Sequence, residues 1–582
     1  MPRIAVVDPE KLRDKHQNLY IQSICPVNRE GKECIRVDAK GRLSIDEKLC
    51  IGCGICVLKS PKDSIHIINL PEELDSPPIH RYGENGFHLY SLPQPSFGKV
   101  VGVLGVNGIG KSTAIKILAG ILKPNLGKDT EAGFSDLVQF FKGTEAQAFF
   151  EGLQKGKIKV SYKPQQVEII PKKAKGTVRH LLQKVDERGK FDDIVEKLQL
   201  GQVLDHDITS ISGGELQRVA VAATALKKAN LYIFDELTSY LDIKQRLRTA
   251  SFIRELATPE TAVLVIEHDL IALDYMADVI HIMYGKPAVY GIVSLPKTTK
   301  AGINVYLEGY IKEHNMRFRD HPLLFDVRPA SKSQQHDTLT SWSGIRKTLG
   351  SFTLTAEAGS ISQKEIVGVL GENGIGKTTL ARILSHVLKP DSGRTDEKIR
   401  ISYKPQYLEP SEYTVREALA KVLEKHQNDI IGPLNLDPLL DMSLEQLSGG
   451  ELQRVAIAAA LAKDCDMFLL DEPSAYLDVE QRITTAKVIE NVVFTTGKSC
   501  LVIDHDLLFL DVLSDRLLVF EGSPAVEGRA KGPYAMEQGM NSLLSGLKIT
   551  LRRDELSHRP RINKPESQKD QAQKAAGKYY YS

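Results

Sequence analysis

The sequence predicts an α/β protein in which a small cysteine-rich N-terminal domain precedes two P-loop nucleotide-binding domains. Three observations predict this organisation. An eight-residue segment at residues 447–454 recurs at residues 211–218 and differs only in its first residue. A glycine-rich loop that ends in lysine and a hydroxyl residue precedes each copy, and an apolar run closed by two acids follows it. Five of the seven cysteines lie between Cys25 and Cys56.

Composition places broad limits on the chain. Its 582 residues are enough for about two to four domains with large cores. The net charge of +2 gives no global argument for nucleic acid, so such a partner would have to bind a local patch. The sequence has no apolar run of about 18 residues, and the apolar run at its N-terminus is too short for a secretory signal. We therefore expect a cytoplasmic protein without a membrane partner.

Cysteine spacing at the N-terminus predicts a ferredoxin-like iron–sulfur domain. Cys50, Cys53 and Cys56 follow the bacterial ferredoxin spacing, and Ser60 stands where a fourth cysteine belongs. In two-cluster ferredoxins that fourth cysteine binds the other cluster, so the close triplet needs a distant cysteine followed by proline. Cys25 meets that requirement. The four thiolates together predict one 4Fe–4S cluster.

The second cluster of such a domain is predicted to be absent. Its other three ligands would lie where the chain has Leu12, Gln17 and Ile21. All ligands of one site are missing while those of the other are kept. This pattern indicates the loss of one whole cluster, because random change would damage both sites. The alternatives are a zinc ion on the same four thiolates and a vestigial fold without metal. Cys34 lies outside the ligand spacing and is assigned to packing, and a proline-rich linker ends this domain at about residues 1–75.

A buried strand, a P-loop and a helix follow one another between residues 100 and 118, in the domain predicted for residues 76–300. This order is the context in which a P-loop match indicates a phosphate site. Glycines let backbone N–H groups converge on phosphate oxygens. Lys111 is expected to bind the β- and γ-phosphates of ATP, and Ser112 to bind Mg²⁺. The residues assigned to nucleotide binding in this loop are Gly105, Asn107, Gly108, Gly110, Lys111, Ser112 and Thr113.

Two acids and a histidine complete the chemistry predicted for this domain. Asp235 ends a strand, where it would hold Mg²⁺ through water, and Glu236 would polarise the attacking water. His268 ends another strand and would contact the γ-phosphate. A structural role is the usual one for such a histidine, but its recurrence in the second copy favours function. Tyr82 and Phe87 are candidates for stacking on adenine, with a place in the core as an equal alternative for Phe87.

The first domain is longer than the second between its P-loop and its signature, which lie at 105 and 212 against 371 and 448. Most of the excess falls at about 130–160 and is predicted to form two short helices around a turn. An insertion on the surface of such a domain is a natural contact for a partner. The alternative is an insertion without function.

The second domain, predicted for residues 326–530, repeats each element. Gln165 and Gln406 both end a Tyr-Lys-Pro-Gln motif and are candidate contacts to Mg²⁺ and the attacking water. Thr378 would bind the second Mg²⁺ as Ser112 binds the first. The remaining candidates of the second domain are Gly371, Asn373, Gly374, Gly376, Lys377 and Thr379 for nucleotide binding, Asp471 for the metal, and Glu472 and His505 for catalysis.

The repeated signature is expected to complete each site from the opposite domain. A P-loop site alone lacks donors on the far side of the γ-phosphate. A Ser-Gly-Gly turn at a helix N-terminus supplies them if the two domains pack head to tail, as in ABC-type ATPases. ATP would then hold the lobes together and hydrolysis would release them. The first P-loop would be completed by Ser448, Gly449 and Gly450, and the second by Ser212, Gly213 and Gly214.

Two further segments are predicted to act as hinges. Hinge 1, at 301–325, contains the segment 315–319, in which cations alternate with apolar residues. This segment would form an interdomain strap or an RNA-facing patch. Hinge 2 and a basic tail occupy 531–582, where Arg559 and Arg561 flank a proline and suggest a second strap packed near the first.

These features together resemble ABC subfamily E, the ribosome-recycling factors once called RNase L inhibitor. The resemblance covers the whole chain. It rests on the cysteine segment 49–56, the first P-loop, both signatures and the hinge motifs at 302–304, 315–319 and 559–564. The nucleotide-binding motifs alone are shared with transporters, whereas the cysteine and hinge motifs are specific to this family.

The resemblance implies a cytoplasmic ATPase that splits ribosomes into subunits with a release factor or a Pelota-like protein. It implies binding to the small subunit and its rRNA through the insertion and the hinges, with a part in initiation or biogenesis. Initiation factors are candidate partners, and we expect a monomer. Two features depart from the family, which has two 4Fe–4S clusters and an Asp-Glu-Pro-Ser motif. The chain keeps ligands for one cluster, and Leu237 replaces the proline, which is expected to alter loop stiffness without abolishing hydrolysis.

Three other functions were weighed. A transporter subunit is disfavoured because membrane spans are missing from the sequence. A DNA-repair ATPase of this class needs a long coiled-coil insertion between its P-loops, which the chain lacks. A ribosome-assembly scaffold that binds ATP with little turnover is disfavoured by Glu236 and Glu472, because such a protein does not need a catalytic carboxylate.

Overall fold

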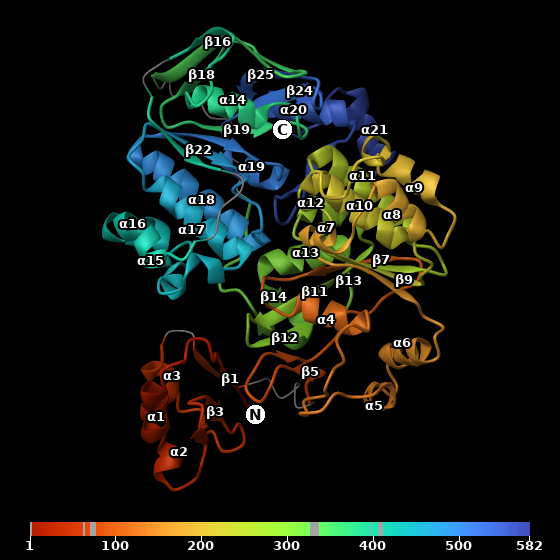
Figure 1. Cartoon of the computed structure of the whole chain (residues 1–582), viewed down its shortest axis with the longest axis vertical. Helices are drawn as coiled ribbons and strands as arrows, with labels where there is room; N and C mark the ends of the chain where they lie inside the picture. Colours follow the sequence, from red (N-terminus) through yellow and green to blue (C-terminus); the bar gives the residue numbers. More distant parts are fainter. Residues whose placement is uncertain are drawn as a thin grey trace.

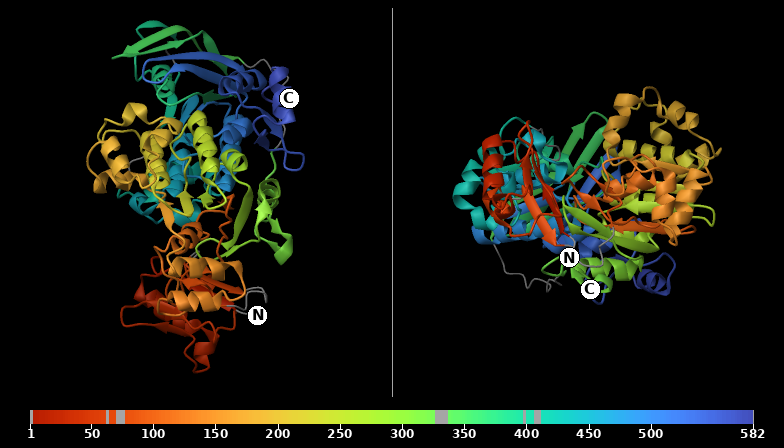
Figure 2. Two further views of the ribbon diagram at one scale, coloured as in Figure 1. Left: turned by 90° about the vertical axis from the view of Figure 1, so that its right-hand side faces the viewer. Right: turned by 90° about the horizontal axis from the view of Figure 1, so that it is seen from below.

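The computed structural model describes residues 3–61, 64–69, 77–325, 337–396, 399–405 and 411–581. A small N-terminal domain lies below two larger α/β lobes (Figure 1). The side view in Figure 2 places the N-terminal domain at one end of the molecule and the C-terminus at the other. Among the described residues no helix is long and apolar enough to cross a membrane.

The N-terminal domain packs three helices against short antiparallel strand pairs. The outer strands pair from Arg3 with Asn69 to Val7 with Ile65, which brings the two ends of the domain together. Its core contains four of the cysteines together with aliphatic residues. The elements are β1 (Arg3–Val7), α1 (Lys15–Ile24), α2 (Pro26–Arg29), β2 (Ile35–Val37), β3 (Leu43–Ile45), α3 (Ile55–Lys59) and β4 (Ile65–Asn69).

The first lobe, described from residue 77, is built on one twisted sheet with the strand order β5-β6-β12-β11-β7-β10-β9-β8. The three central parallel strands are buried along their whole length, as expected for continuous apolar runs covered on both faces. The strands are β5 (His80–Arg81), β6 (His88–Leu89), β7 (Val100–Leu104), β8 (Val160–Lys163), β9 (Leu231–Asp235), β10 (Ala262–Ile266), β11 (Val279–Lys286), β12 (Tyr290–Val293) and β13 (Lys297–Thr298).

The helices of the first lobe cover the sheet and carry the insertion. The insertion contains two consecutive helices, α5 and α6, which pack on each other and stand out at the lower right of Figure 1. The helices are α4 (Lys111–Leu118), α5 (Phe134–Phe140), α6 (Glu145–Gln154), α7 (Ile170–Lys173), α8 (Val178–Lys184), α9 (Phe191–Lys197), α10 (Gly213–Leu226), α11 (Ile243–Leu256), α12 (Leu270–Met276) and α13 (Thr299–Glu308).

The second lobe repeats the same strand order in its central sheet, β21-β22-β23-β19-β24-β25, continued by β17, β16 and β18. The chain enters it through the hairpin β14 (Tyr310–Ile311) and β15 (Met316–Arg317). The strands are β16 (Thr338–Leu349), β17 (Phe352–Ala356), β18 (Gly359–Ser362), β19 (Ile366–Leu370), β20 (Ser392–Thr395), β21 (Ile401–Lys404), β22 (Met467–Asp471), β23 (Ser499–Ile503), β24 (Arg516–Ser523) and β25 (Glu527–Ala535).

The helices of the second lobe correspond to those of the first, with the signature again at the start of a long helix. A C-terminal hairpin and a last helix follow them. These elements are α14 (Lys377–Leu384), α15 (Val415–Ala418), α16 (Ala420–Lys425), α17 (Gly449–Leu461), α18 (Val479–Thr496), α19 (Leu507–Leu513), α20 (Met536–Leu547), β26 (Leu551–Arg553), β27 (Pro560–Ile562) and α21 (Gln568–Ala575).

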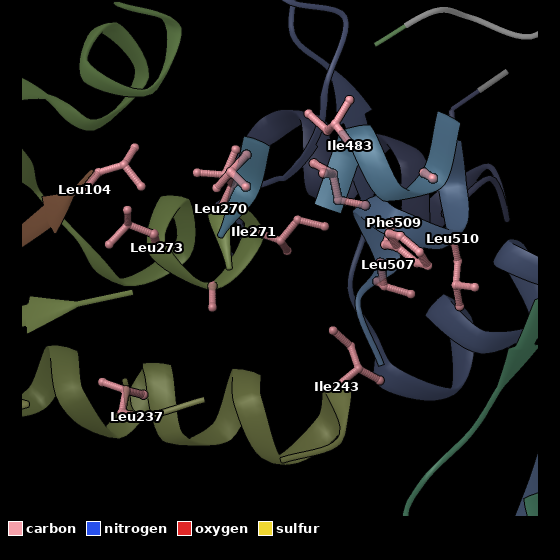
Figure 3. Packing of buried hydrophobic residues seen from close by; sticks show 14 of the residues in the cluster. Leu104, Leu237, Ile243, Leu270, Ile271, Leu273, Ile483, Leu507, Phe509 and Leu510 are labelled. Atoms are coloured by element: carbon pink, nitrogen blue, oxygen red, sulfur yellow. The ribbon is translucent and has the colours of Figure 1, made fainter. Parts of the chain in front are cut away.

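One hydrophobic cluster contains residues of both lobes. Leu270 and Ile271 of α12 face Leu507 and Phe509 of α19 across the seam (Figure 3). Leu237, which stands where the second copy of the motif has Pro473, is fully buried in the same cluster. The two lobes are therefore joined by an apolar seam.

Polar contacts of the two hinge segments add to that seam. Arg319 Nε donates to Glu480 Oε2 at 3.0 Å, which ties hinge 1 to α18. Arg561 binds both carboxylate oxygens of Asp274 at 2.7 and 2.9 Å, which ties the C-terminal hairpin to α12. Asn304 of α13 also donates to Asp554 of the C-terminal segment at 3.0 Å. The hinge segments thus act as straps that lie next to each other.

Candidate functional site

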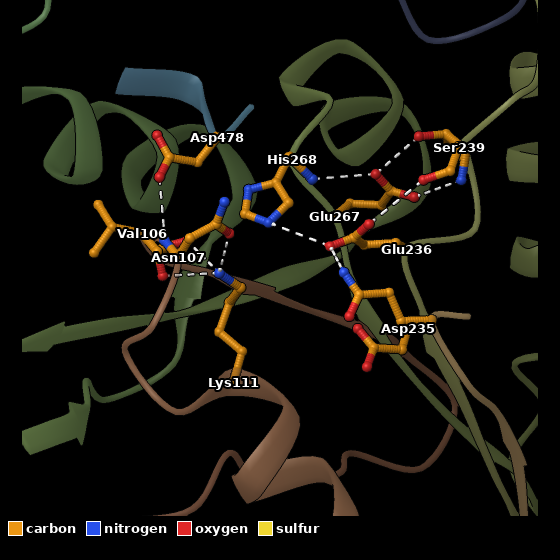
Figure 4. A network of polar contacts seen from close by, with 12 residues as sticks. Val106, Asn107, Lys111, Asp235, Glu236, Ser239, Glu267, His268 and Asp478 are labelled. Atoms are coloured by element: carbon orange, nitrogen blue, oxygen red, sulfur yellow. Dashed lines mark hydrogen bonds and ion pairs between the residues drawn. The ribbon is translucent and has the colours of Figure 1, made fainter. Parts of the chain in front are cut away.

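The P-loop lysine of the first lobe lies at the N-terminus of α4. Lys111 Nζ donates to the carbonyl oxygens of Gly105 and Val106, both at 2.8 Å (Figure 4). Gly110 directly before it has φ of 94°, and a Cβ there would meet the Phe87 ring at 2.5 Å, so only glycine fits. Burial lowers the pKa of Lys111 to about 8. A bound triphosphate would restore the charge that burial disfavours.

Asp235, the last residue of β9, and Glu236 directly after it line the same cavity as this lysine. Asp235 accepts a hydrogen bond from Tyr162 at 3.4 Å, and burial raises its pKa above the ordinary range. Glu236 Oε1 accepts from Gln165 Nε2 at 2.6 Å. Burial, and then the charges of Asp235 and Glu267, raise the pKa of Glu236 to about 7. The arrangement gathers a carboxylate, an amide and a basic carboxylate around one point.

His268 completes this group as a buried, unsatisfied ring. Its Nε2 lies 3.8 Å from Glu236 Oε1, as Figure 4 shows. Neither ring nitrogen has a hydrogen-bond partner within the part of the chain that the structure describes. Burial, followed by the charge of Lys111, lowers the pKa of His268 well below its ordinary value. A neutral imidazole with free nitrogens at this position fits a phosphate oxygen, so the residues present fit ATP.

The signature of the second lobe lines the same cavity as the first P-loop. The cavity has a volume of about 820 Å³ and receives side chains from both lobes. Ser448, which caps α17 by accepting from Glu451 N at 3.4 Å, is one of the lining residues that the second lobe contributes. Of the residues assigned from the sequence, the lining includes Tyr82, Phe87, Asn107, Gly108, Gly110, Lys111, Ser112, Thr113, Gln165, Asp235, Glu236, His268, Ser448, Gly449, Gly450, Glu472 and His505.

One aspartate links each P-loop to the opposite lobe. Asn107 N donates to Asp478 Oδ2 at 3.1 Å, and Asn373 N donates to Asp242 Oδ2 at 3.0 Å. Asp478 and Asp242 follow the two acidic pairs at the same offset, in the Tyr-Leu-Asp segments. The structure thus places each carboxylate on the P-loop backbone of the opposite lobe.

The second P-loop has the same local geometry. Lys377 Nζ donates to Gly371 O at 2.7 Å and lies 3.0 Å from His505 Nε2. Thr378 Oγ1 donates to Asp471 Oδ2 at 3.2 Å, as a hydroxyl that shares a metal with that carboxylate would. Gly374, Gly376 and Thr379 lie in the same loop and the first turn of α14. Gln406 lies outside the described residues.

The first signature stands next to the second P-loop through one tyrosine. Tyr240 packs its ring on Gly213, where an added Cβ would lie 3.4 Å away. The carbonyl oxygen of Tyr240 accepts from Asn373 Nδ2 at 3.2 Å. Ser212 and Gly214 flank this contact at the start of α10. The second pair of half-sites therefore faces across the seam in the same sense as the first.

The two aromatic candidates for adenine stacking differ in their surroundings. Tyr82 is 47% exposed at the rim of the cavity, and its hydroxyl lies 3.2 Å from Thr113 Oγ1. Phe87 is partly buried and packs on Gly110 and the core of the first lobe. The contacts of Phe87 therefore match a place in the core. Tyr82 has the more exposed ring and is the better placed of the two for stacking on adenine.

Asn85, between these two aromatic residues, anchors the N-terminal domain to the first lobe. Its Nδ2 donates to Ala5 O at 3.0 Å and Ile45 O at 2.9 Å, and its Oδ1 accepts from Ile45 N at 2.8 Å. Val7 N also donates to the Asn85 carbonyl at 2.9 Å. Sequence reasoning missed this residue, because an asparagine in a loop carries no pattern that identifies its partners.

The four predicted cluster ligands line one small cavity in the N-terminal domain. Cys34, which was assigned from the sequence to packing, is only 1% exposed and also lines that cavity. Burial and the charges of Cys50 and Cys53 raise the pKa of Cys56 to about 11. A positively charged metal centre would relieve that repulsion, so the donor set fits a cluster. In the described residues no three His, Cys, Asp or Glu side chains are already gathered at metal-binding distance.

None of the four positions expected for a second ligand set is a cysteine. Leu12 and Ile21 are 4% and 0% exposed and belong to the core of the domain. Gln17 is partly exposed, and Ser60 Oγ donates to Val57 O at 3.1 Å. Two of the four positions are thus part of the hydrophobic core, and the other two carry polar side chains.

Comparisons with known proteins match the whole chain. The ABC transporter family model matches residues 95–239 and 355–475, so the chain carries two ATP-binding cassettes. An uncharacterized ABC transporter ATP-binding protein of Methanocaldococcus jannaschii is 48% identical over 100% of this chain and 97% of the relative. The translation initiation factor RLI1 of Saccharomyces cerevisiae is 44% identical over 100% of this chain and 98% of the relative.

Two solved structures match the fold closely. A chain in a model of ribosome-bound archaeal Pelota and ABCE1 has a TM-score of 0.94 and 48% identity, over 100% of this chain and 99% of that one. The second is a crystal structure of archaeal ribosomal stalk protein aP1 with archaeal ribosome recycling factor aABCE1. It has a TM-score of 0.83 and 48% identity, over 87% of this chain and 99% of the other.

Proposed function

This chain belongs to the ABCE1/RLI1 family, and we propose that it is a cytoplasmic ATPase that splits ribosomes into subunits. It works with a release factor or a Pelota-like protein and binds the small subunit, where initiation factors are further candidate partners. The observation that carries the proposal is the cavity of about 820 Å³ to which both lobes contribute. A site that is complete only when the lobes meet converts nucleotide binding into movement.

Hydrolysis is assigned to two composite sites. At site one, Lys111 binds the β- and γ-phosphates, Glu236 polarises the attacking water and His268 contacts the γ-phosphate. Ser448 and the backbone N–H groups after it, at the N-terminus of α17, close the far side of the phosphate. Ser112, Gln165 and, through water, Asp235 would hold Mg²⁺, which would neutralise phosphate charge when bound.

Site two uses the equivalent residues in the same roles. Lys377 and Thr378 bind the phosphates and the metal, with Gln406 and Asp471 as further metal contacts. Glu472 and His505 act on the attacking water and the γ-phosphate. The first signature closes this site from the other side, through Ser212, Gly213 and Gly214.

Movement of the N-terminal domain follows from its attachment. Asn85 holds that domain and lies between Tyr82 and Phe87, on the loop that borders the nucleotide cavity. A nucleotide that reorders this loop therefore shifts the attachment point of the domain. The N-terminal domain then acts as the lever that separates the ribosomal subunits.

The cysteine site is assigned to one 4Fe–4S cluster held by Cys25, Cys50, Cys53 and Cys56. When bound, the cluster would cross-link the junction of α1 and α2, at Cys25, to the loop before α3 and the first turn of α3. Chemical analysis of anaerobically purified protein is expected to give near four iron and four sulfide per chain, because none of the four positions expected for the second ligand set is a cysteine. Near eight of each would contradict the single cluster, and one zinc without iron would favour the alternative.

A matched pair of variants tests the ligand set. Cys25→Ser is expected to lose the iron and sulfide, since it removes the distant ligand of the closed site. Cys34→Ser changes a buried thiol in the same cavity and is expected to keep both. Equal losses in the two variants would show that the cavity needs intact packing rather than Cys25 as a ligand.

Ribosome splitting is the direct test of the proposed function. Ribosomes incubated with this chain, a Pelota-like protein and ATP are expected to separate into subunits on a sucrose gradient. ADP in place of ATP is expected to leave them intact. Splitting that proceeds equally well with a Glu236→Gln/Glu472→Gln variant would favour the scaffold alternative, in which turnover is not required.

A further inference from the structure

Each catalytic glutamate has an unusual backbone conformation. Glu236 has φ of 49° and Glu472 has φ of 47°, in the left-handed region that residues other than glycine rarely adopt. Such a conformation persists only where surrounding contacts fix it. The contacts that surround the two glutamate carbonyl groups are the same in both lobes.

One buried lysine in each lobe holds the backbone of the acidic pair. Lys163 Nζ donates to the carbonyl oxygens of Asp235 and Glu236, both at 2.9 Å. Lys404 Nζ donates to the two corresponding carbonyl oxygens of the second lobe, at 2.8 and 3.4 Å. The two lysines are 0% and 1% exposed. Two successive peptide groups are thus bound by one ammonium.

A glutamine from the signature helix binds the same carbonyl group from the other side. Gln217 Nε2 donates to Glu236 O at 2.6 Å, and Gln453 Nε2 donates to Glu472 O at 2.6 Å. Both glutamines are buried. Each glutamate carbonyl therefore accepts one hydrogen bond from an ammonium and one from an amide, which opposes rotation of the peptide group.

The strand register places the lysines where they reach these carbonyl groups. Lys163 is the last residue of β8 and pairs with Phe234 of β9, and Lys404 ends β21 and pairs with Leu470 of β22. Each side chain extends past the end of the neighbouring strand. Among the described residues that line the nucleotide cavity, neither lysine is present.

We propose that Lys163 and Lys404 are positioning residues for hydrolysis, each fixing the backbone of the catalytic glutamate so that its carboxylate faces the attacking water. The inference rests on the proposed ATPase function. An ammonium suits this position, because a charged donor holds a carbonyl more firmly than a neutral donor does. Both lysines act through the glutamates and leave nucleotide binding to the P-loops.

The test compares Lys163→Met, Lys404→Met and the double variant with the wild type. Methionine fills a similar volume without a donor, so the strand ends stay packed. The double variant is expected to lose about tenfold to a hundredfold in kcat, with the Kd of a fluorescent ATP analogue changed by less than about threefold. Lys159→Met, at an exposed position just before β8, is the matched control and is expected to match the wild type.

The effect of the lysine variants in a background that lacks the catalytic carboxylates distinguishes a positioning role from general support of the fold. In a Glu236→Gln/Glu472→Gln background the two methionines are expected to add little further loss, because the groups they position are already disabled. Unchanged kcat in the double variant would overturn the inference while the ATPase function stands. A joint loss of kcat, nucleotide affinity and thermal stability would also overturn the inference. A wild type without ATP turnover would overturn both.

Discussion

Glu472→Gln is expected to lower ATP turnover at site two by about a hundredfold or more, the usual contribution of a positioned general base. Glutamine keeps the shape of the side chain and loses the carboxylate that polarises water. Nucleotide binding is expected to persist, because Lys377 and the P-loop backbone are untouched. The lobes should then stay closed on unhydrolysed ATP.

Single-turnover hydrolysis of radiolabelled ATP measures this effect at each site. Glu236→Gln silences site one, so the two single variants and the double variant separate the contributions of the sites. Glu424→Gln, at an exposed position on α16, is the control and is expected to leave turnover unchanged. Wild-type turnover in the double variant would remove both glutamates from the mechanism.

Ser448→Arg is expected to abolish hydrolysis at site one although Ser448 belongs to the second lobe. The arginine would extend into the cavity that Ser448 and Lys111 both line, and it would remove the side-chain cap of α17. Loss of the cap alone costs about 1 kcal/mol, which a folded domain of this size tolerates. The expected loss in turnover is about a hundredfold or more, as for a missing donor to developing charge.

Variants in which one site is already inactive show which site the Ser448 signature completes. In a Glu472→Gln background, where site two is inactive, Ser448→Arg is expected to remove the remaining turnover. In a Glu236→Gln background, the same change is expected to leave site two active. Ser212→Arg is the matched control and is expected to show the opposite pattern. Loss at site two rather than site one would mean that each lobe completes its own site.

Repeated motifs allowed most of the architecture to be predicted from the sequence. Two ATP-binding cassettes were predicted from a motif set that occurs twice, and the family match confirms them. Most of the residues assigned to site one line a single cavity, although Gly105 is not among its lining residues. The roles of these residues stay predictions until activity is measured.

Long-range contacts were less accessible from the sequence. Asp242 and Asp478 recur at the same offset after the two acidic pairs, but their binding to the opposite P-loop depends on how the lobes pack. Lys163 and Lys404 each precede the Pro-Gln of a repeated motif in which only the glutamine was singled out. Their recurrence was the available signal, and the strand register that gives it meaning appears only in the folded sheet.

Leu237 illustrates how packing replaces a missing proline. Its side chain is buried in the cluster between the lobes. The next residue, Thr238, donates through its backbone N–H to Glu267 Oε1 at 2.7 Å and through its hydroxyl to Oε2 at 2.9 Å. Ser474 makes the equivalent contacts to Asp504. The loop is therefore fixed by a buried carboxylate in both lobes, whether or not it contains proline.

A structure of the chain with a non-hydrolysable ATP analogue and Mg²⁺ shows whether each site is completed by the opposite lobe. Two nucleotides are expected between the lobes. The γ-phosphate of one would contact Lys111 and the backbone N–H groups after Ser448, and that of the other would contact Lys377 and those after Ser212. Two nucleotides each enclosed by a single lobe, with the opposite signature remote from the γ-phosphate, would contradict it.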